Sequence, residues 1–179
     1  MLTFLSVSIV THNNESTINR CVDSFIKYLP KNLKVKIYVI DNASEDRTYN
    51  CLQNLSKKYK MIKISKCPMN LGYGRAQNTI LQELESNYHL FCNPDIISRE
   101  NFLDPLIKCM DANAKIGIIA PMTLNLDGTV HWSNRRYPGV GDLVLRRSPE
   151  FVKRLFKKRD MKKAISRMRL GVENNRRRN

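Results

Sequence analysis

The sequence is short of glycine, with 7 in 179 residues, and none lies in the turn after the first apolar run. That turn reads Thr11-His12-Asn13-Asn14-Glu15. A dinucleotide-binding fold needs glycines there so that the backbone can approach a pyrophosphate, and a P-loop needs a glycine pattern of its own. Their absence argues against the classical nucleotide oxidoreductases and against P-loop NTPases.

Cysteines are few, and long apolar runs are missing from the sequence. Without a Cys-x-x-Cys pair, we expect reduced, packed thiols rather than a zinc site or a disulfide framework. No apolar run approaches the roughly 20 residues that span a bilayer. The run Leu2–Val10 is too short for a signal peptide and lacks a basic start. We therefore expect a cytoplasmic protein, either soluble or peripheral on the inner face of the membrane. The five cysteines are Cys21, Cys51, Cys67, Cys92 and Cys109.

Positive charge is plentiful but uneven along the chain. From Arg146 to Asn179 there are 14 Lys and Arg against 3 acidic residues, a net charge of +11 out of +15, which leaves +4 for the rest. This asymmetry predicts one domain over residues 1–145 and a basic tail over residues 146–179. The domain itself needs no polyanionic partner to explain its charge.

The basic tail carries apolar residues at approximately helical spacing, among them Phe151, Leu155 and Ile165. A basic amphipathic helix can bind an anionic membrane surface. The alternative is that these apolar residues pack on the domain while the charges are solvated. Binding to nucleic acid is a third interpretation, which we do not favour because aromatic residues are not interleaved as base-stacking platforms.

Strand-like and helix-like patterns alternate along the first 120 residues. Apolar positions at helical spacing separate the strand candidates, with Ser44 and Ser98 as expected helix caps and a third helix expected over residues 76–84. The alternation predicts an α/β fold, Rossmann-like in its first half, whose mostly parallel sheet has helices on both faces. The expected strands are Phe4–Val10, Val35–Ile40, Met61–Ser65, Tyr88–Cys92 and Ile116–Ala120.

Polar side chains follow three of the expected strands. In an open α/β sheet this is the end at which ligands bind, and such groups suit a base, a ribose and a metal on a diphosphate. Asp95 is a hard oxygen ligand suited to Mg²⁺ or Mn²⁺. Two plainer interpretations stay open, since Asn-Pro-Asp is also ordinary turn chemistry and Asp41 also suits a turn into a helix. The strand-end residues are Thr11, Asn13, Asp41, Asn42, Asn93 and Asp95.

A polar, glycine-containing loop precedes the third helix. It reads Asn70-Leu71-Gly72-Tyr73-Gly74-Arg75-Ala76-Gln77-Asn78. Gly72 and Gly74 allow positive φ or close backbone approach, and the start of a helix favours anions. Arg75 is a donor suited to a phosphate or a base. A plain loop-to-helix cap explains the glycines but not the clustered amides and Arg75.

At this point the sequence resembles the family 2 glycosyltransferases. The likeness covers roughly residues 5–140 and is strongest to the rhamnosyltransferase-like branch that builds bacterial surface polysaccharides, with Asp127-Gly128 and Ser133–Pro138 also similar to that branch. The motifs stand in the order and spacing of the family. They are Ser8-Ile9-Val10-Thr11-His12-Asn13, Val39-Ile40-Asp41-Asn42-Ala43-Ser44-Glu45-Asp46, the loop over residues 70–78, and Phe91-Cys92-Asn93-Pro94-Asp95.

The resemblance implies a GT-A fold and a nucleoside-diphosphate-sugar donor, UDP- or dTDP-linked. It implies transfer of the sugar, rhamnose in that branch, with inversion to a polysaccharide or lipid-linked saccharide. By the same resemblance Asp95 would ligate Mg²⁺ or Mn²⁺, in a motif that replaces the usual acidic one. The residues it assigns to the nucleotide sugar are Thr11, Asn13, Asp41, Asn42, Gly72, Arg75 and Asn93.

The sequence departs from the family pattern further along. The family has a Gly-Ala segment followed by an acidic Glu-Asp pair that supplies the general base, and nothing here matches. An inverting transfer needs a base to deprotonate the acceptor hydroxyl. Asp142, close to a glycine-rich loop, is a weak candidate. The alternative is a truncated or split gene product that binds the donor without efficient transfer.

Overall fold

The computed structural model describes residues 4–125 and 127–131 of the chain. Asp142, the basic tail over residues 146–179 and the motif over residues 133–138 lie outside the described residues. The chain divides into two units, Met1–Pro121 and Met122–Asn179, which are treated separately. The predicted boundary at residue 145 therefore stays a prediction.

The first unit is built around a parallel sheet of four strands. The strands are β1 (Phe4–Thr11), β2 (Lys34–Asp41), β3 (Ile62–Lys66) and β4 (Tyr88–Cys92), in the order β3-β2-β1-β4. All three pairings are parallel, and Thr11 at the end of β1 pairs with Asp41 at the end of β2. The predicted α/β class and mostly parallel sheet are confirmed.

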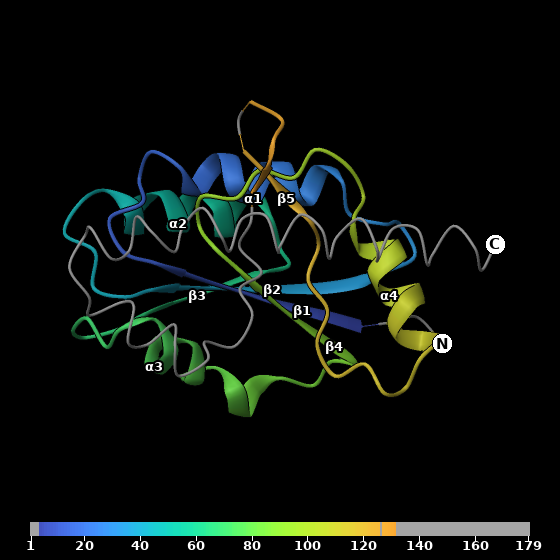
Figure 1. The fold of residues 1–179 in the computed structure, drawn as a ribbon. Helices are drawn as coiled ribbons and strands as arrows, with labels where there is room; N and C mark the ends of the chain where they lie inside the picture. Colours follow the sequence, from blue (N-terminus) through green and yellow to red (C-terminus); the bar gives the residue numbers. More distant parts are fainter. Residues whose placement is uncertain (1–3, 126, 132–179) are drawn as a thin grey trace, which may run out of the picture. The chain divides into compact units, whose positions relative to one another are not determined.

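Helices cover both faces of the sheet (Figure 1). On one face α1 (Ile18–Lys27) and α2 (Thr48–Lys58) pack with the inward residues of β1 and β2, and Leu103 of α4 (Leu103–Asp111) joins the same core. On the other face α3 (Tyr73–Asn78) and the 3₁₀ helix η1 (Leu81–Glu83) accompany a smaller core. Val10, Tyr38, Ile40, Cys67, Ala76 and Ile80 form this second core.

β1 is buried along nearly its whole length, as a central parallel strand should be. Three of its buried residues, Ser6, Ser8 and Thr11, are polar, and the first two share a partner. Both hydroxyls bond to the His89 ring of β4, at 2.6 Å to Nδ1 and 2.9 Å to Nε2. The imidazole therefore provides a hydrogen-bond partner for both buried hydroxyls, and the Ser6 hydroxyl also contacts the Ser86 hydroxyl.

The predicted helix starts and the third helix differ from the structure. Ser44 does not cap α2, because its hydroxyl accepts from the Asn13 backbone, while Asp46 accepts from the Thr48 N–H at the helix start. Ser98 does not cap α4 but donates its backbone N–H to Ser24. The helix expected over residues 76–84 is split into α3 and η1. Hydrogen bonds to residues in other segments of the chain therefore override the helix caps expected from the local sequence.

The prediction of a fifth strand at Ile116–Ala120 was wrong. These residues are in neither helix nor strand, and Ile118 is 92% exposed. A strand requires a partner, and among the described strands β4 pairs only with β1. An apolar, β-branched segment is therefore not sufficient to form a strand here.

The described part of the second unit is a short hairpin of β5 (Thr123–Leu124) and β6 (Val130–His131). Gly128 has φ of +82°, and the Asp127 carboxylate accepts from the Thr129 N–H at 2.9 Å. Asp127 is thus a turn residue, as its neighbour Gly128 suggested. Over residues 4–125 and 127–131, we found no helix with the length and apolarity needed to cross a bilayer.

Candidate functional site

The strand order of the parallel sheet has a switch point between β1 and β4. From β1 the chain moves outward to β2 and β3, and it then returns to place β4 on the other side of β1. Open α/β sheets bind ligands beside such a switch point, at the carboxyl ends of the strands. This edge carries Thr11, Asp41 and the Asn93-Pro94-Asp95 segment, so the predicted polar strand ends share one edge.

The loops that follow β1 and β2 hold each other through side-chain to backbone hydrogen bonds. The Asn13 amide oxygen accepts from the Glu45 N–H at 2.9 Å, and the Asn13 N–H donates to the Ser44 hydroxyl at 3.0 Å. Asn13 and Ala43 both have left-handed backbone, with φ of 57° and 60°. Such a conformation is uncommon outside glycine and marks a closely constrained pair of loops.

Asn42 connects these loops to the glycine-containing loop. Its Nδ2 donates to Asn70 Oδ1 at 2.8 Å, and its Oδ1 accepts from the Leu71 N–H at 2.9 Å. Asn70 Oδ1 also accepts from the Gly72 N–H at 2.9 Å. Since Asn42 is buried, we assign it a positioning role: it holds the loop around Gly72 against the end of β2.

Asp41 presents the chemically most unusual group of this edge. Its side chain is fully buried, and Oδ1 accepts from the Ser44 N–H at 3.2 Å. Its Oδ2 has no hydrogen-bond partner among the described residues. An unpartnered buried carboxylate oxygen is costly, and it marks a place where a donor from a bound molecule would be stabilising.

Thr11 lies behind this edge. Its hydroxyl donates to the Ile40 carbonyl at 3.3 Å, its own carbonyl accepts from the Asn42 N–H at 2.8 Å, and the residue is fully buried. In this structure Thr11 ties β1 to β2. Its direct contact with a nucleotide stays a prediction.

The remaining predicted residues are exposed. Gly72 has φ of +75°, which only glycine adopts easily, and Arg75 lies on α3. Asn93 and Asp95 are exposed beyond β4, and no hydrogen bond or ion pair joins the Asp95 carboxylate to another described residue. Hydrogen bonds therefore unite Asn13, Asp41 and Asn42 with the Gly72 loop, but they do not extend to Arg75 or Asp95.

The chemistry of Asp95 fits a magnesium or manganese ion carried by a diphosphate. Within the described ranges, no three His, Cys, Asp or Glu side chains gather as a metal site. An all-protein cage is not needed, because Mg²⁺ commonly uses one or two carboxylates together with substrate phosphates and water. One free carboxylate at the ligand-binding edge satisfies that requirement.

Two residues at this edge were not among the predicted site residues. The His12 Nδ1 lies 3.0 Å from the Asn42 carbonyl oxygen. The amide of Gln77, on α3, is buried, and neither its nitrogen nor its oxygen has a partner in the described part of the chain. Gln77 belongs to the polar loop motif, but its burial depends on how α3 packs and leaves no mark in the sequence.

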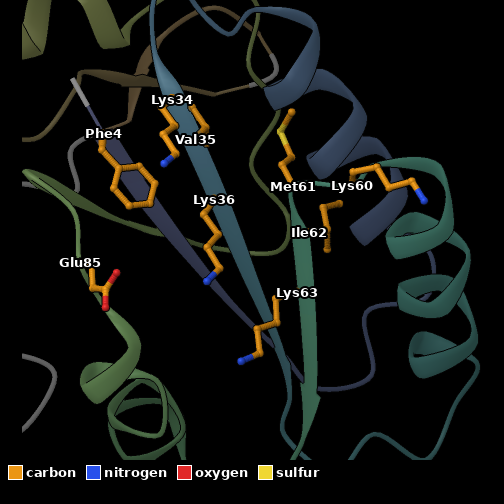
Figure 2. Close-up of a pocket in the computed structure, with 9 residues that line it drawn as sticks. All are labelled: Phe4, Lys34, Val35, Lys36, Lys60, Met61, Ile62, Lys63 and Glu85. Atoms are coloured by element: carbon orange, nitrogen blue, oxygen red, sulfur yellow. The ribbon is translucent and has the colours of Figure 1, made fainter. Parts of the chain in front are cut away.

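A separate pocket of about 320 Å³ lies at the opposite edge of the sheet (Figure 2). Its lining includes the amino ends of the first three strands, so it is not part of the polar edge just described. Lysines dominate its charge. The lining residues are Phe4, Lys34, Val35, Lys36, Lys60, Met61, Ile62, Lys63 and Glu85.

The chain is similar to known glycosyltransferases. It matches the sequence model of "Glycosyl transferase family 2" over residues 6–172. It is 29% identical over 112 residues to an uncharacterized glycosyltransferase of Haemophilus influenzae, covering 63% of this chain and 34% of that protein. It is 25% identical over 117 residues to the N-acetylglucosaminyl-diphospho-decaprenol L-rhamnosyltransferase of Mycobacterium tuberculosis, covering 59% and 37%.

Solved structures agree with the sequence comparison. The crystal structure of S. aureus TarS in complex with UDP-GlcNAc superposes with a TM-score of 0.54 at 26% identity, covering 62% of this chain and 32% of that chain. The chain spans about a third of the length of these relatives. Since the family match covers most of the 179 residues, this protein belongs to glycosyltransferase family 2 and has the GT-A type of α/β fold.

Proposed function

We propose that this domain binds a UDP- or dTDP-linked sugar at the carboxyl edge of its sheet and transfers the sugar to a saccharide acceptor. The buried Asp41 Oδ2 without a partner carries the proposal. A carboxylate accepts hydrogen bonds only, and a uracil or thymine base offers an N–H donor that it would satisfy. The similar S. aureus TarS, in complex with UDP-GlcNAc, supports a UDP-linked donor.

Around Asp41, the other residues have distinct roles in the proposed site. Asn13 and Asn42 position the loops, and Gly72 allows the backbone to pass close to the donor. Arg75 and Asn93 contribute donors toward the sugar diphosphate. Asp95 would hold Mg²⁺ or Mn²⁺, and the ion would neutralise the charge of the diphosphate leaving group.

The finer activity that we propose is inverting transfer of rhamnose to a lipid-linked saccharide, on the cytoplasmic side of a membrane. The rhamnosyltransferase of Mycobacterium tuberculosis supports it, because the name of that enzyme includes a diphospho-decaprenol saccharide. The general base is not identified among the described residues. A second candidate function is binding of the donor by this chain without efficient transfer, because an inverting transfer needs a general base.

Calorimetric titration of the full chain with UDP and with dTDP, each with and without Mg²⁺ or Mn²⁺, tests donor binding. We expect binding of at least one nucleotide with a dissociation constant below about 1 mM, strengthened by metal. A chain that binds neither would refute the proposal. Incubation with the corresponding donor sugars then separates the two functions, since hydrolysis or transfer supports the enzyme and binding without turnover supports the second candidate.

A further inference from the structure

Two buried thiols lie directly beneath the segment that follows β4. Cys21 is on α1 and is 1% exposed, and Cys92 is the last residue of β4 and is 9% exposed. Both sulfur atoms lie 3.4 Å from the carbonyl oxygen of Asn93, toward which each thiol donates. Two S–H groups that share one acceptor have to converge on it, so the two sulfur atoms lie on the same side of the Asn93 carbonyl.

Helix α1 contacts the segment after β4 at two points. The Cys21 thiol donates to the Asn93 carbonyl, with 3.4 Å between sulfur and oxygen. One turn further along α1, the Ser24 hydroxyl accepts from the Ser98 N–H at 3.0 Å. The inner face of α1 therefore holds residues 93–98 in place, and Cys21 is a positioning residue for the turn that carries Asp95.

The pKa values of the two thiols are shifted in opposite directions. The neighbouring Cys92 thiol and burial raise the pKa of the Cys21 thiol, whereas the neighbouring Cys21 thiol lowers the pKa of Cys92. The thiolate is the reactive form of cysteine, so Cys92 is the member that an oxidant meets first. Cys92 is also the more exposed of the two.

We propose that Cys21 and Cys92 form a dithiol modification site that a small peroxide converts to a disulfide. The Cys92 thiolate attacks one oxygen of hydrogen peroxide, the O–O bond breaks, and Cys92 sulfenic acid and hydroxide form. The Cys21 sulfur then attacks the Cys92 sulfur, the S–O bond breaks, and the hydroxyl group leaves with a proton as water. In total two thiols are oxidised, and one peroxide is reduced to two waters.

The disulfide changes the turn that follows β4. Both S–H donors to the Asn93 carbonyl are lost, because neither sulfur of a disulfide carries a hydrogen. Resting on the function proposed above, this loss of support at Asp95 weakens donor binding in the presence of metal. Reduction by a dithiol reagent restores it, because no atom other than the two hydrogens has been removed.

Peptide mapping of the full chain tests the site directly. The folded chain is treated with hydrogen peroxide, remaining thiols are blocked with N-ethylmaleimide in denaturant, and tryptic peptides are read by mass spectrometry. Trypsin yields peptides 21–27 and 76–99, each of which holds one cysteine of the pair. We expect these peptides to be linked, with two of the five thiols lost and both recovered by dithiothreitol.

Variants and ligand binding sharpen the result. Cys92→Ser abolishes the linked peptide, whereas the control Cys109→Ser, at an exposed cysteine, leaves it unchanged. The proposal is overturned if peptides 21–27 and 76–99 are both recovered with N-ethylmaleimide on their cysteines while other cysteines are oxidised.

The effect on the turn is tested by ligand binding. We expect UDP with Mg²⁺ to bind the oxidised chain about fivefold more weakly than the reduced chain. Equal affinities of the oxidised and reduced chains would contradict the effect on the turn. If the reduced chain binds no UDP, the proposed function is refuted, and the peptide mapping alone then tests whether the disulfide forms.

Discussion

At the scale of single residues, the carboxyl edge combines buried polar groups that lack a partner among the described residues with groups that are satisfied. The Oδ2 atom of Asp41 has no hydrogen-bond partner among the described residues, whereas Asn42 uses both its amide nitrogen and its amide oxygen in hydrogen bonds to the loop that contains Gly72. The Asp95 side chain is exposed beyond β4. These three environments are the basis of the roles that we propose: ligand binding for Asp41, positioning for Asn42 and metal binding for Asp95.

Asn42→Ala is expected to lower the free energy of unfolding by about 2 kcal/mol, because two hydrogen bonds of a buried amide are lost. Urea unfolding followed by circular dichroism measures the change. Asn54→Ala, on the exposed surface of α2, is the matched control, and it should be neutral or slightly stabilising because alanine favours helix. Equal effects of the two substitutions would show that Asn42 does not hold the loop.

Asp95→Ala is expected to remove the dependence of UDP affinity on Mg²⁺ or Mn²⁺, because no second carboxylate lies in the Asn-Pro-Asp segment. Asn93→Ala should have a milder effect, since water can replace a neutral amide near a metal. Titrations of both variants at zero and saturating metal measure the difference. If Mg²⁺ or Mn²⁺ strengthens UDP binding equally in wild type and Asp95→Ala, the role of Asp95 is only structural, within the turn after β4.

At the scale of elements, the pairing of β1 with β4 brings a buried polar cluster together. The Ser6 and Ser8 hydroxyls bond to both nitrogens of the His89 ring, which lies edge-on to Phe91 with centroids 4.5 Å apart. Burial lowers the pKa of His89 below its usual value near 6.5. The folded protein therefore prefers the neutral imidazole.

This cluster predicts a loss of stability in mildly acidic solution. As the pH falls below about 6.5, the unfolded chain takes up a proton at His89 before the folded chain does, so the free energy of unfolding decreases until the lower pKa of the folded state is reached. Thermal melting between pH 7.5 and 5 measures this change. His89→Gln should flatten the profile in that window, and a profile unchanged by the substitution would contradict the assignment.

Sequence patterns predicted most elements of the sheet, because burial and strand or helix periodicity agree there. The strands β1, β2, β3 and β4 lie at or near the expected residues. The failures are at places where tertiary contacts decide. The Ser44 hydroxyl bonds to Asn13 from another loop, and Ile116–Ala120 lacks a partner strand among the described residues.

The polar residues of the site could be predicted, but their roles could not. The positions of Asp41 and Asn42 at a strand end follow from the sequence. That one oxygen of Asp41 is unpartnered, that Thr11 is buried behind the edge, and that Gln77 is enclosed all depend on contacts between segments about 30 residues apart or more. Only the folded arrangement shows which polar group is left for a ligand.

At the scale of the whole molecule, we compare two sets of basic residues, one defined by the sequence and one by the structure. One set is the basic tail over residues 146–179, with a net charge of +11. The other set is the four lysines around the pocket in Figure 2, namely Lys34, Lys36, Lys60 and Lys63. Both would contribute to binding of an anionic surface, so their effects have to be separated by experiment.

We expect the basic tail to dominate binding to anionic vesicles. Changing Lys153, Lys157, Lys158 and Lys162 to Gln should reduce co-sedimentation with phosphatidylserine-containing liposomes, because each basic residue near such a surface contributes about 1 kcal/mol. The matched control changes the four pocket lysines to Gln and removes the same charge. If the control lowers binding as much as the tail variant does, the tail is not the membrane anchor.

The most direct test of the central claim is the affinity of UDP, in the presence of Mg²⁺, for the wild type and for Asp41→Asn. The substitution keeps the size of the side chain and removes the carboxylate that has the unpartnered oxygen. We predict that binding weakens by about 10-fold or more, since hydrogen bonds to charged groups contribute about 1.5–3 kcal/mol, while the melting temperature is not lowered. Equal affinities of the two proteins for UDP would contradict the role of Asp41 as the hydrogen-bond acceptor for the base of the nucleotide.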